Sequence, residues 1–225
     1  MNVAKRVMPV IVIAGISTLV AISLVAQQPQ SRPLSPDGVA SVQVLGKWVK
    51  SERQTYTMGG ERYQDGKWID ILYGRPLLRG REAFPGTGAD YGKATLGPDA
   101  QVWRAGANLS TRLRSEVPLA IGGKTVAAGE YTVFIDLKQP TEWTFIVSSW
   151  PAQTKYDPQN KEALYGAFNY TADRDVVRAP MKVDSLPYRV EQLTWQFLDM
   201  TNAGGRIALM WDRSMGSVAF KVAQD

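Results

Sequence analysis

Apolar and polar side chains alternate in short runs from residue 53 to residue 222, and turns that contain glycine separate these runs. In the run 67–73, the side chains of Ile69, Ile71 and Tyr73 fall on one face of an extended strand. A period of two residues is typical of β-strands, and the helical period of about 3.6 residues hardly occurs in this chain. We therefore expect an all-β fold, either an antiparallel β-sandwich or a jelly-roll-like barrel.

The alternating runs predict roughly nine or ten short strands, joined largely by hairpin turns such as Gly122-Gly123. One short helical turn fits residues 160–164, because Pro158 could begin it and Gly166 could end it. The expected strands cover residues 53–58, 67–73, 111–117, 124–127, 131–137, 143–148, 175–183, 188–200 and 207–222.

The first residues have the pattern of an export signal, with Lys5 and Arg6 ahead of an apolar run over residues 7–26. The run is also long enough to stay in place as a membrane anchor, although we favour cleavage. Residues 27–41 read as a flexible tether, and residues 42–225 as a single domain. We expect the protein to be exported to the periplasm or cell envelope, and to meet the membrane only through residues 7–26 if they are retained.

The chain contains no cysteine and no histidine. This composition excludes thiolate nucleophiles, imidazole bases, disulfides and cysteine-ligated zinc. Carboxylate acid/base chemistry, Ser–Lys or Tyr–Lys pairs and all-oxygen metal sites remain open. No metal site or cofactor motif is recognisable, so we expect neither. An exported chain without cysteine is more typical of a bacterial envelope than of a eukaryotic secreted module.

The charge balance is only mildly basic. Residues 27–225 hold 24 lysines and arginines against 21 aspartates and glutamates, because residues 1–26 contain two cations and no anions. Nucleic-acid binding usually requires dense clusters of basic residues, and no run of five or more occurs. We therefore do not expect a nucleic-acid partner.

The segment from Gly74 to Gly106 holds seven glycines and three prolines, which predicts one long loop between strands. Long loops on a rigid sheet often carry binding groups. This loop and the residues just after it also concentrate charged and planar side chains. The resulting candidate binding residues are Arg75, Arg79, Arg81, Tyr91, Lys93, Trp103, Arg104 and Asn108.

The four arginines of this loop admit two interpretations. Their guanidinium groups could hold a carboxylate, sulfate or phosphate of a ligand through paired hydrogen bonds. We favour the alternative that they tie the loop down by pairing with Asp90, Asp99 and Glu116, because buried arginines are normally paired. We further expect Arg104 to be structural and at least one of Arg79 and Arg81 to be free for a ligand.

The aromatic residues also allow two roles. Trp103 could stack on a sugar ring, but a tryptophan in an all-β protein more often lies in the core. Trp150 stands beside a proline in a polar segment, so we expect it to be more exposed. Asn108 follows a glycine turn, where a short polar side chain commonly bonds to its own backbone.

Several motifs resemble those of the DUF2911 family, which is bacterial, mostly exported and without an assigned function. They are YGRPLLRGR from Tyr73, YGK from Tyr91, VWRAGAN from Val102, IGGKTVAAGEYTVF from Ile121 and EWTFIV from Glu142. The resemblance covers about residues 50–222. It implies an exported β domain and supplies no catalytic residues.

Three functions remain open at this point. The first is an envelope-located binding module for an anionic or carbohydrate ligand. The second is a histidine-free hydrolase or lyase that uses carboxylates, or a Ser/Tyr–Lys pair around Tyr91 and Lys93. The third is a structural or assembly partner of another envelope protein. Whether the protein is an enzyme is left undecided by the sequence.

Overall fold

The computed structural model describes residues 33–50, 60–97 and 99–223, which belong to one compact unit beginning at Pro33. Strands dominate this part of the chain, and helix is limited to 3-10 turns of three residues, η2 (Gly88–Asp90), η3 (Lys93–Thr95) and η4 (Ala172–Arg174). The predicted all-β class is confirmed. No helix of the described residues is long and apolar enough to cross a membrane.

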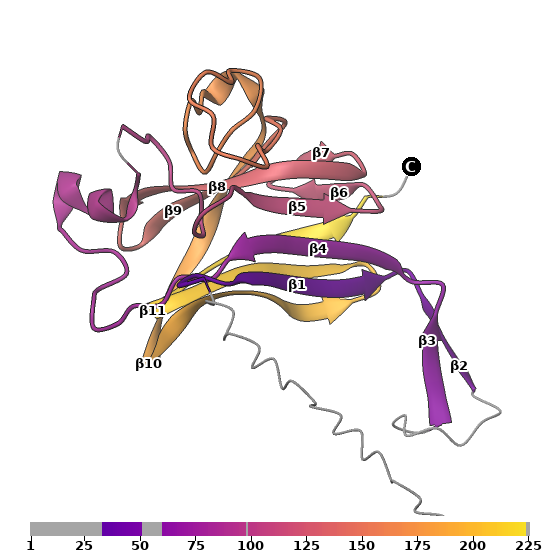
Figure 1. Cartoon of the computed structure of the whole chain (residues 1–225). Helices are drawn as coiled ribbons and strands as arrows, with labels where there is room; N and C mark the ends of the chain where they lie inside the picture. Colours follow the sequence, from indigo (N-terminus) through magenta and orange to yellow (C-terminus); the bar gives the residue numbers. More distant parts are fainter. Residues whose placement is uncertain (1–32, 51–59, 98, 224–225) are drawn as a thin grey trace, which may run out of the picture. The chain divides into compact units, whose positions relative to one another are not determined.

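Nine strands form one antiparallel sheet, and two more form a separate hairpin (Figure 1). The hairpin pairs β2 (Lys47–Lys50) with β3 (Glu61–Gln64). In spatial order, the sheet consists of β1 (Asp37–Val44), β4 (Lys67–Gly74), β5 (Thr111–Ser115), β8 (Gly129–Gln139), β9 (Glu142–Ser148), β10 (Asp175–Thr201), β11 (Gly204–Val222), β6 (Leu119–Ile121) and β7 (Lys124–Val126).

The long strand β10 lets the sheet fold back on itself. Residues 175–181 of β10 pair with β9, whereas residues 182–201 pair with β11. Just beyond β4, Leu77 forms an isolated bridge with Gln192 of β10. The chain at the end of β4 therefore pairs with β10, which comes much later in the sheet. This architecture agrees with the antiparallel prediction, and the finer description as a sandwich or a jelly-roll-like barrel stays a prediction.

The main core follows the predicted alternation. Ile69, Ile71 and Tyr73 are all buried on the inner face of β4. The predicted core tryptophans are buried as well: Trp103, Trp143, Trp195 and Trp211. Burying a large apolar side chain contributes about 1.5–3 kcal/mol, so these inward faces stabilise the curved sheet.

A second, smaller core lies on the outer face of the sheet. It is built by residues 149–174, here named the capping loop, which folds over β8 and β9 (Figure 1). Phe134 of β8 and Ile146 of β9 point outward and pack with Trp150 and Leu164 of this loop. The expectation that Trp150 is exposed is therefore wrong, since only 7% of it is accessible.

The capping loop also lacks the helical turn expected at residues 160–164. Leu164 instead forms a parallel bridge with Ala152, and its backbone N–H donates to the carbonyl of Pro151 at 2.7 Å. The loop is organised around the buried side chain of Gln153 rather than around a helix.

The strands differ from the prediction in several places, and β2, β3 and β6 were not predicted. The tether predicted for residues 27–41 extends too far, because residues 37–41 belong to β1, which pairs with β4 along its whole length. Its inward side chains at Ala40 and Val44 are small, so the alternation is weak in the sequence. The predicted strands 175–183 and 188–200 are instead one continuous strand, β10, whereas the predicted strand 207–222 corresponds to β11. Register shifts interrupt the pairing of β10 with β11. The predicted leader 1–26 and strand 53–58 lie outside the described residues.

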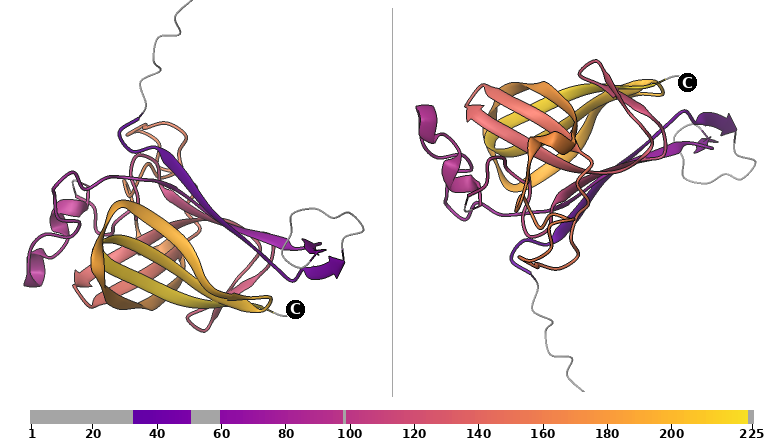
Figure 2. Two further views of the ribbon diagram at one scale, coloured as in Figure 1. Left: turned by 90° about the horizontal axis from the view of Figure 1, so that it is seen from below. Right: turned by 90° about the horizontal axis from the view of Figure 1, so that it is seen from above.

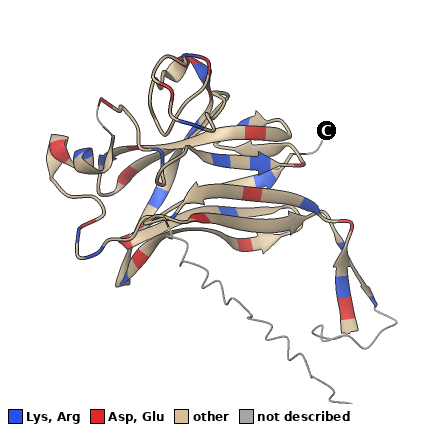
Figure 3. Cartoon of the chain, in the orientation of Figure 1, with Lys and Arg blue, Asp and Glu red and all other residues tan. Residues whose placement is uncertain are grey.

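Two features project from opposite ends of the sheet (Figure 2). Residues 75–110, here named the arginine loop, carry η2 and η3 and occupy one end. The β2–β3 hairpin extends at the other end. Acidic and basic positions are interspersed over strands and loops, in keeping with the mild net charge (Figure 3).

Candidate functional site

The arginine loop is fastened to the sheet at its start and near its end. At its start, the Leu78 N–H donates to the Glu191 carbonyl at 2.9 Å, and the Leu193 N–H donates to the Pro76 carbonyl at 3.0 Å. Near its end, Trp103 and Ile135 exchange backbone hydrogen bonds of 2.8 and 2.9 Å. Trp103 thus pairs with β8 just beyond the residues that pair with β5, so the loop is held in register with a rigid strand.

Phe84 anchors the middle of the loop in the end of the core. Its ring meets Trp143, Trp103 and Trp211 edge-on, with centroid distances of 4.8, 5.2 and 5.8 Å. Edge-to-face contacts of this kind are favoured by aromatic quadrupoles. The rings of Trp103 and Trp211 are themselves nearly parallel, 5.9 Å apart. The Phe84 ring and the three tryptophans therefore form an aromatic cluster that covers this end of the core.

Asp212 and Arg189 hold the backbone beside Phe84. The Asp212 carboxylate accepts from the Ala83 N–H at 3.2 Å and from the Arg189 Nε at 2.7 Å. Arg189 also donates to the Arg81 carbonyl at 2.8 Å. Burial alone would raise the pKa of Asp212, but the hydrogen bonds from Arg189 and Ala83 outweigh it, so the pKa lies below its usual value. This carboxylate is ionised at neutral pH and serves as a clamp.

The turn after Arg104 depends on close approach of two backbone segments. A Cβ atom added to Gly74 would lie 2.1 Å from the Ala107 carbonyl oxygen, so only glycine fits there. Ala105 has a positive φ of 54°, and its carbonyl accepts from Trp195 Nε1 at 3.0 Å and from Thr111 Oγ1 at 3.1 Å. These contacts fix the direction of the Arg104 side chain.

A pocket of about 570 Å³ lies beneath the arginine loop and is here named the main pocket. Its size is in the range of small-molecule sites, about 300–1,000 Å³. Its polar and charged lining consists of Arg81, Glu82, Thr95, Arg104 and Asn108. Most of the remaining lining is apolar and comes from Pro76, Leu78, Ala83, Pro85, Ala94, Trp103, Ala107 and Trp211.

Arg104 is a half-buried cation in this wall. Its Nη1 donates to the Asn108 carbonyl at 2.7 Å, and its guanidinium lies against Gly166 of the capping loop. No carboxylate of the described residues forms an ion pair with it. Burial lowers the pKa of Arg104, although nearby Tyr165 acts in the opposite direction. The guanidinium nevertheless stays charged.

The other three arginines differ in their surroundings. Arg81 lines the main pocket and donates to the carbonyls of Leu78 and Leu77 at 3.0 and 2.9 Å. Arg79 is exposed and Arg75 is half-buried, and neither lines the main pocket.

The predicted ion pairs of the arginines with Asp90, Asp99 and Glu116 are not formed among the described residues. Asp90 pairs with Lys93 instead, and the Glu116 carboxylate accepts from the Trp68 N–H. The reason is geometric, because the loop is fastened through its backbone and its aromatic side chains, and these acids do not face its arginines.

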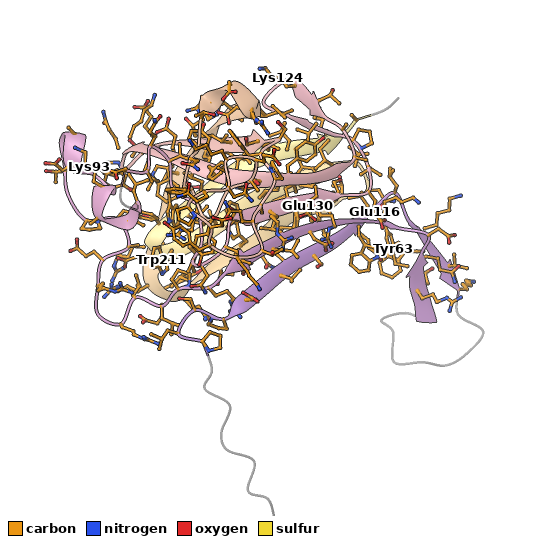
Figure 4. The ribbon with its side chains drawn as sticks, turned by 45° about the horizontal axis from the view of Figure 1, so that its top comes forward. Tyr63, Lys93, Glu116, Lys124, Glu130 and Trp211 are labelled. Carbon is orange, nitrogen blue, oxygen red and sulfur yellow. The ribbon has the colours of Figure 1, made fainter. Side chains whose placement is uncertain are left out.

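Tyr91 and Lys93 are separated in sequence only by Gly92 but take different partners. The Tyr91 hydroxyl is buried and accepts from Trp143 Nε1 at 3.2 Å. Burial raises the pKa of Tyr91 more than this hydrogen bond lowers it. Lys93 lies at the outer part of the loop, where its Nζ is 3.0 Å from Asp90, whereas Trp211 lies in the body of the domain (Figure 4). The Tyr–Lys arrangement considered from the sequence is therefore not assembled.

A second pocket of about 460 Å³ adjoins the main pocket through Glu82. Tyr91, Arg189, Asp212 and Arg213 contribute to its wall. The structure thus brings together Arg81, Trp103, Arg104 and Asn108 from the predicted set, whereas Tyr91 lines only the second pocket. Asn108 does not close its own turn, because its side chain donates to the Ser35 carbonyl at 3.1 Å.

Glu82 and Trp211 are among the pocket residues that were not predicted from the sequence. Glu82 directly follows the YGRPLLRGR motif and could have been included on that ground. Trp211 comes from β11, and no local pattern connects it with the loop. Among the described residues, no group of three or more His, Cys, Asp or Glu side chains is placed to hold a metal ion.

Comparison with known proteins assigns the chain that forms these pockets to a protein family. The profile of DUF2911, a protein family of unknown function, matches residues 54–220. The chain belongs to the DUF2911 family. No curated protein and no solved structure matches the chain. The matched range of this DUF2911 domain contains every residue that lines the main pocket and the second pocket.

Proposed function

We propose that this DUF2911 domain is a binding module that holds an anionic ligand in the main pocket. The observation that carries the proposal is Arg104, a half-buried guanidinium in the pocket wall without a carboxylate partner among the described residues. Removing a charge from water is costly unless it is paired and hydrogen-bonded. An anionic group of a ligand would supply the missing partner.

Arg81, an exposed residue that also lines the main pocket, supports the same role. Two of its N–H groups are used by the carbonyls of Leu77 and Leu78, which fix its guanidinium in place. An arginine has five N–H donors, so others remain for a ligand. Because the Asp212–Arg189 clamp holds the backbone of residues 81–83, this donor is positioned before a ligand arrives. Preorganisation of this kind reduces the entropic cost of binding.

The carbohydrate form of the hypothesis has less support. Trp103 is only 2% exposed, and its ring is covered by Phe84 and Trp211. It therefore presents no open face on which a sugar could stack. We also propose that the domain works outside the cytoplasm, in the cell envelope, on the basis of the Lys5-Arg6 and apolar-run pattern of the leader.

The test is thermal unfolding of the full chain with and without added anions. A ligand that binds only the folded state must raise the melting temperature in a concentration-dependent way. Phosphate, sulfate, acetate, benzoate and glucuronate form the panel, each compared with sodium chloride at equal ionic strength. We expect at least one of them to stabilise the wild type, and Arg104→Gln to abolish that stabilisation.

Arg79→Gln is the matched control, since Arg79 is an exposed arginine of the same loop outside the pocket. It should keep the full response to the anion. If no member of the panel stabilises the wild type, or if both variants lose the response equally, the proposed function is wrong.

A further inference from the structure

We propose that the ligand of the main pocket is an amphipathic organic monoanion, a single carboxylate group attached to an apolar body. This inference rests on the proposed function and narrows it to one chemical class. It is drawn from the charge of the pocket wall, from the few polar partners that the wall offers and from the size of the pocket.

The charge of the wall fits one negative charge. Arg81 and Arg104 supply two cations, and Glu82 supplies one anion, so the wall carries a net charge of +1. The neighbouring Arg189 is already neutralised by Asp212 at 2.7 Å. A second negative charge on the ligand would meet Glu82 without a further free cation in the wall. Glu82 is exposed, so the repulsion from its carboxylate is weakened by solvent but still acts against a second negative charge placed beside it.

The polar partners of the wall are few. The Thr95 hydroxyl already donates to the Ala83 carbonyl, and the Asn108 amide donates to the Ser35 carbonyl. A sugar with several hydroxyl groups would therefore bury polar groups without hydrogen bonds, which costs binding free energy. Leu78, Pro76 and Pro85 instead offer apolar contact. The wall favours a hydrocarbon or aromatic body.

The volume of the pocket points in the same direction. At about 570 Å³, it is much larger than a phosphate or sulfate ion requires. Small-molecule sites typically combine a mostly apolar lining with a small number of oriented polar groups. Here those groups are the guanidinium of Arg104, with Arg81 beside it.

The experiment compares three molecules that share one ring system and differ in charge with two polar anions that lack it. Isothermal titration of the full chain would use 2-naphthoate, the neutral 2-naphthamide, the dianion 2,3-naphthalenedicarboxylate, glucuronate and phosphate. We expect 2-naphthoate to bind about tenfold or more tightly than each of the others, since charge-assisted hydrogen bonds are roughly twice as strong as neutral ones. Arg104→Gln should lower the affinity for 2-naphthoate by about tenfold and leave the affinity for 2-naphthamide little changed.

Glu82→Gln tests the selection against a second charge. This variant should bind the dicarboxylate more tightly relative to 2-naphthoate than the wild type does. The control Arg79→Gln should leave the order of affinities unchanged. Tighter binding of phosphate, glucuronate or the dicarboxylate than of 2-naphthoate would overturn the inference of an amphipathic monoanion and leave the anion-binding function standing. Absence of binding by every anion would overturn both.

Discussion

The arginine loop and the capping loop both cover parts of the same sheet, but they do so in opposite ways. The capping loop fills the space beneath it with Trp150, Leu164 and Tyr170, which form a closed second core. The arginine loop places Leu78, Tyr91 and Trp103 in the main core and packs Phe84 against it, yet it also forms most of the wall of the main pocket. A long, polar loop can therefore be either a structural cover or the wall of a site. What distinguishes them is whether their polar groups find partners inside the protein.

The capping loop satisfies its polar groups internally. Gln153 is buried, donates to the carbonyls of Ala163 and Asp157, and accepts from the Asp157 N–H. Arg174 stacks over the Trp150 ring at 3.9 Å. In the arginine loop, by contrast, Arg104 has only a backbone carbonyl as its partner among the described residues.

The largest predicted effect concerns the filling of the capping loop. Trp150→Ala should lower the free energy of unfolding by about 3–5 kcal/mol, because it leaves a cavity against Phe134 and Ile146. Tyr156→Ala is the control, since Tyr156 lies in the same loop but is 57% exposed. Urea unfolding measures both. Equal losses in the two variants would mean that the capping loop is not a packed core.

A smaller loss is expected from the polar centre of the capping loop. Gln153→Ala leaves buried backbone groups without partners and should cost about 1–3 kcal/mol. The exposed Gln159 has no side-chain role in this network, so Gln159→Ala should be nearly neutral. Chemical denaturation of the two variants measures the difference in their free energies of unfolding. Stability unchanged in Gln153→Ala would show that water replaces its hydrogen bonds at no cost.

The smallest predicted effect is the acid sensitivity of the clamp on the arginine loop. The pKa of Asp212 is lowered in the folded state, so its contribution is fully present above the unfolded value of about 3.9. It is lost as the pH falls through the lower folded pKa. The unfolding free energy of the wild type should therefore fall more steeply below about pH 4 than that of Asp212→Asn.

Arg189→Gln provides the second arm of this test. Arg189→Gln removes the side-chain hydrogen bond to Asp212. The difference in unfolding free energy between Arg189→Gln and the double variant Arg189→Gln/Asp212→Asn should therefore vary less with pH than the difference between the wild type and Asp212→Asn. Parallel pH profiles for the wild type and Asp212→Asn would contradict the assignment of Asp212 as an ionised clamp.

The sequence predicts the strands well where one face is buried. β4 alternates clearly, and its inward residues are the predicted ones. The buried position of Trp150 was missed because β8 and β9 are buried on both faces. The signal for this was present, since Val133, Phe134 and Ile135 form an unbroken apolar run, which is typical of strands covered on both sides.

The candidate site was predicted in part for a similar reason. Arg81, Trp103 and Arg104 stand out locally as charged and planar residues within a glycine-rich loop. Trp211 completes the pocket only because β11 brings it parallel to Trp103, which depends on the path of the whole sheet. Carboxylate partners for the arginines were predicted wrongly, because sequence proximity does not fix which way a loop side chain faces.

The most direct test of the central claim uses the indole N–H signals of the protein in a ¹⁵N-edited NMR titration. Trp211 lines the main pocket, whereas Trp150 lies in the closed core of the capping loop, and single Phe substitutions assign the two signals. If the arginine loop is a binding wall and the capping loop a cover, 2-naphthoate shifts the Trp211 signal, saturates, and leaves the Trp150 signal in place. A titration that moves only the Trp150 signal, or moves neither, would contradict the account.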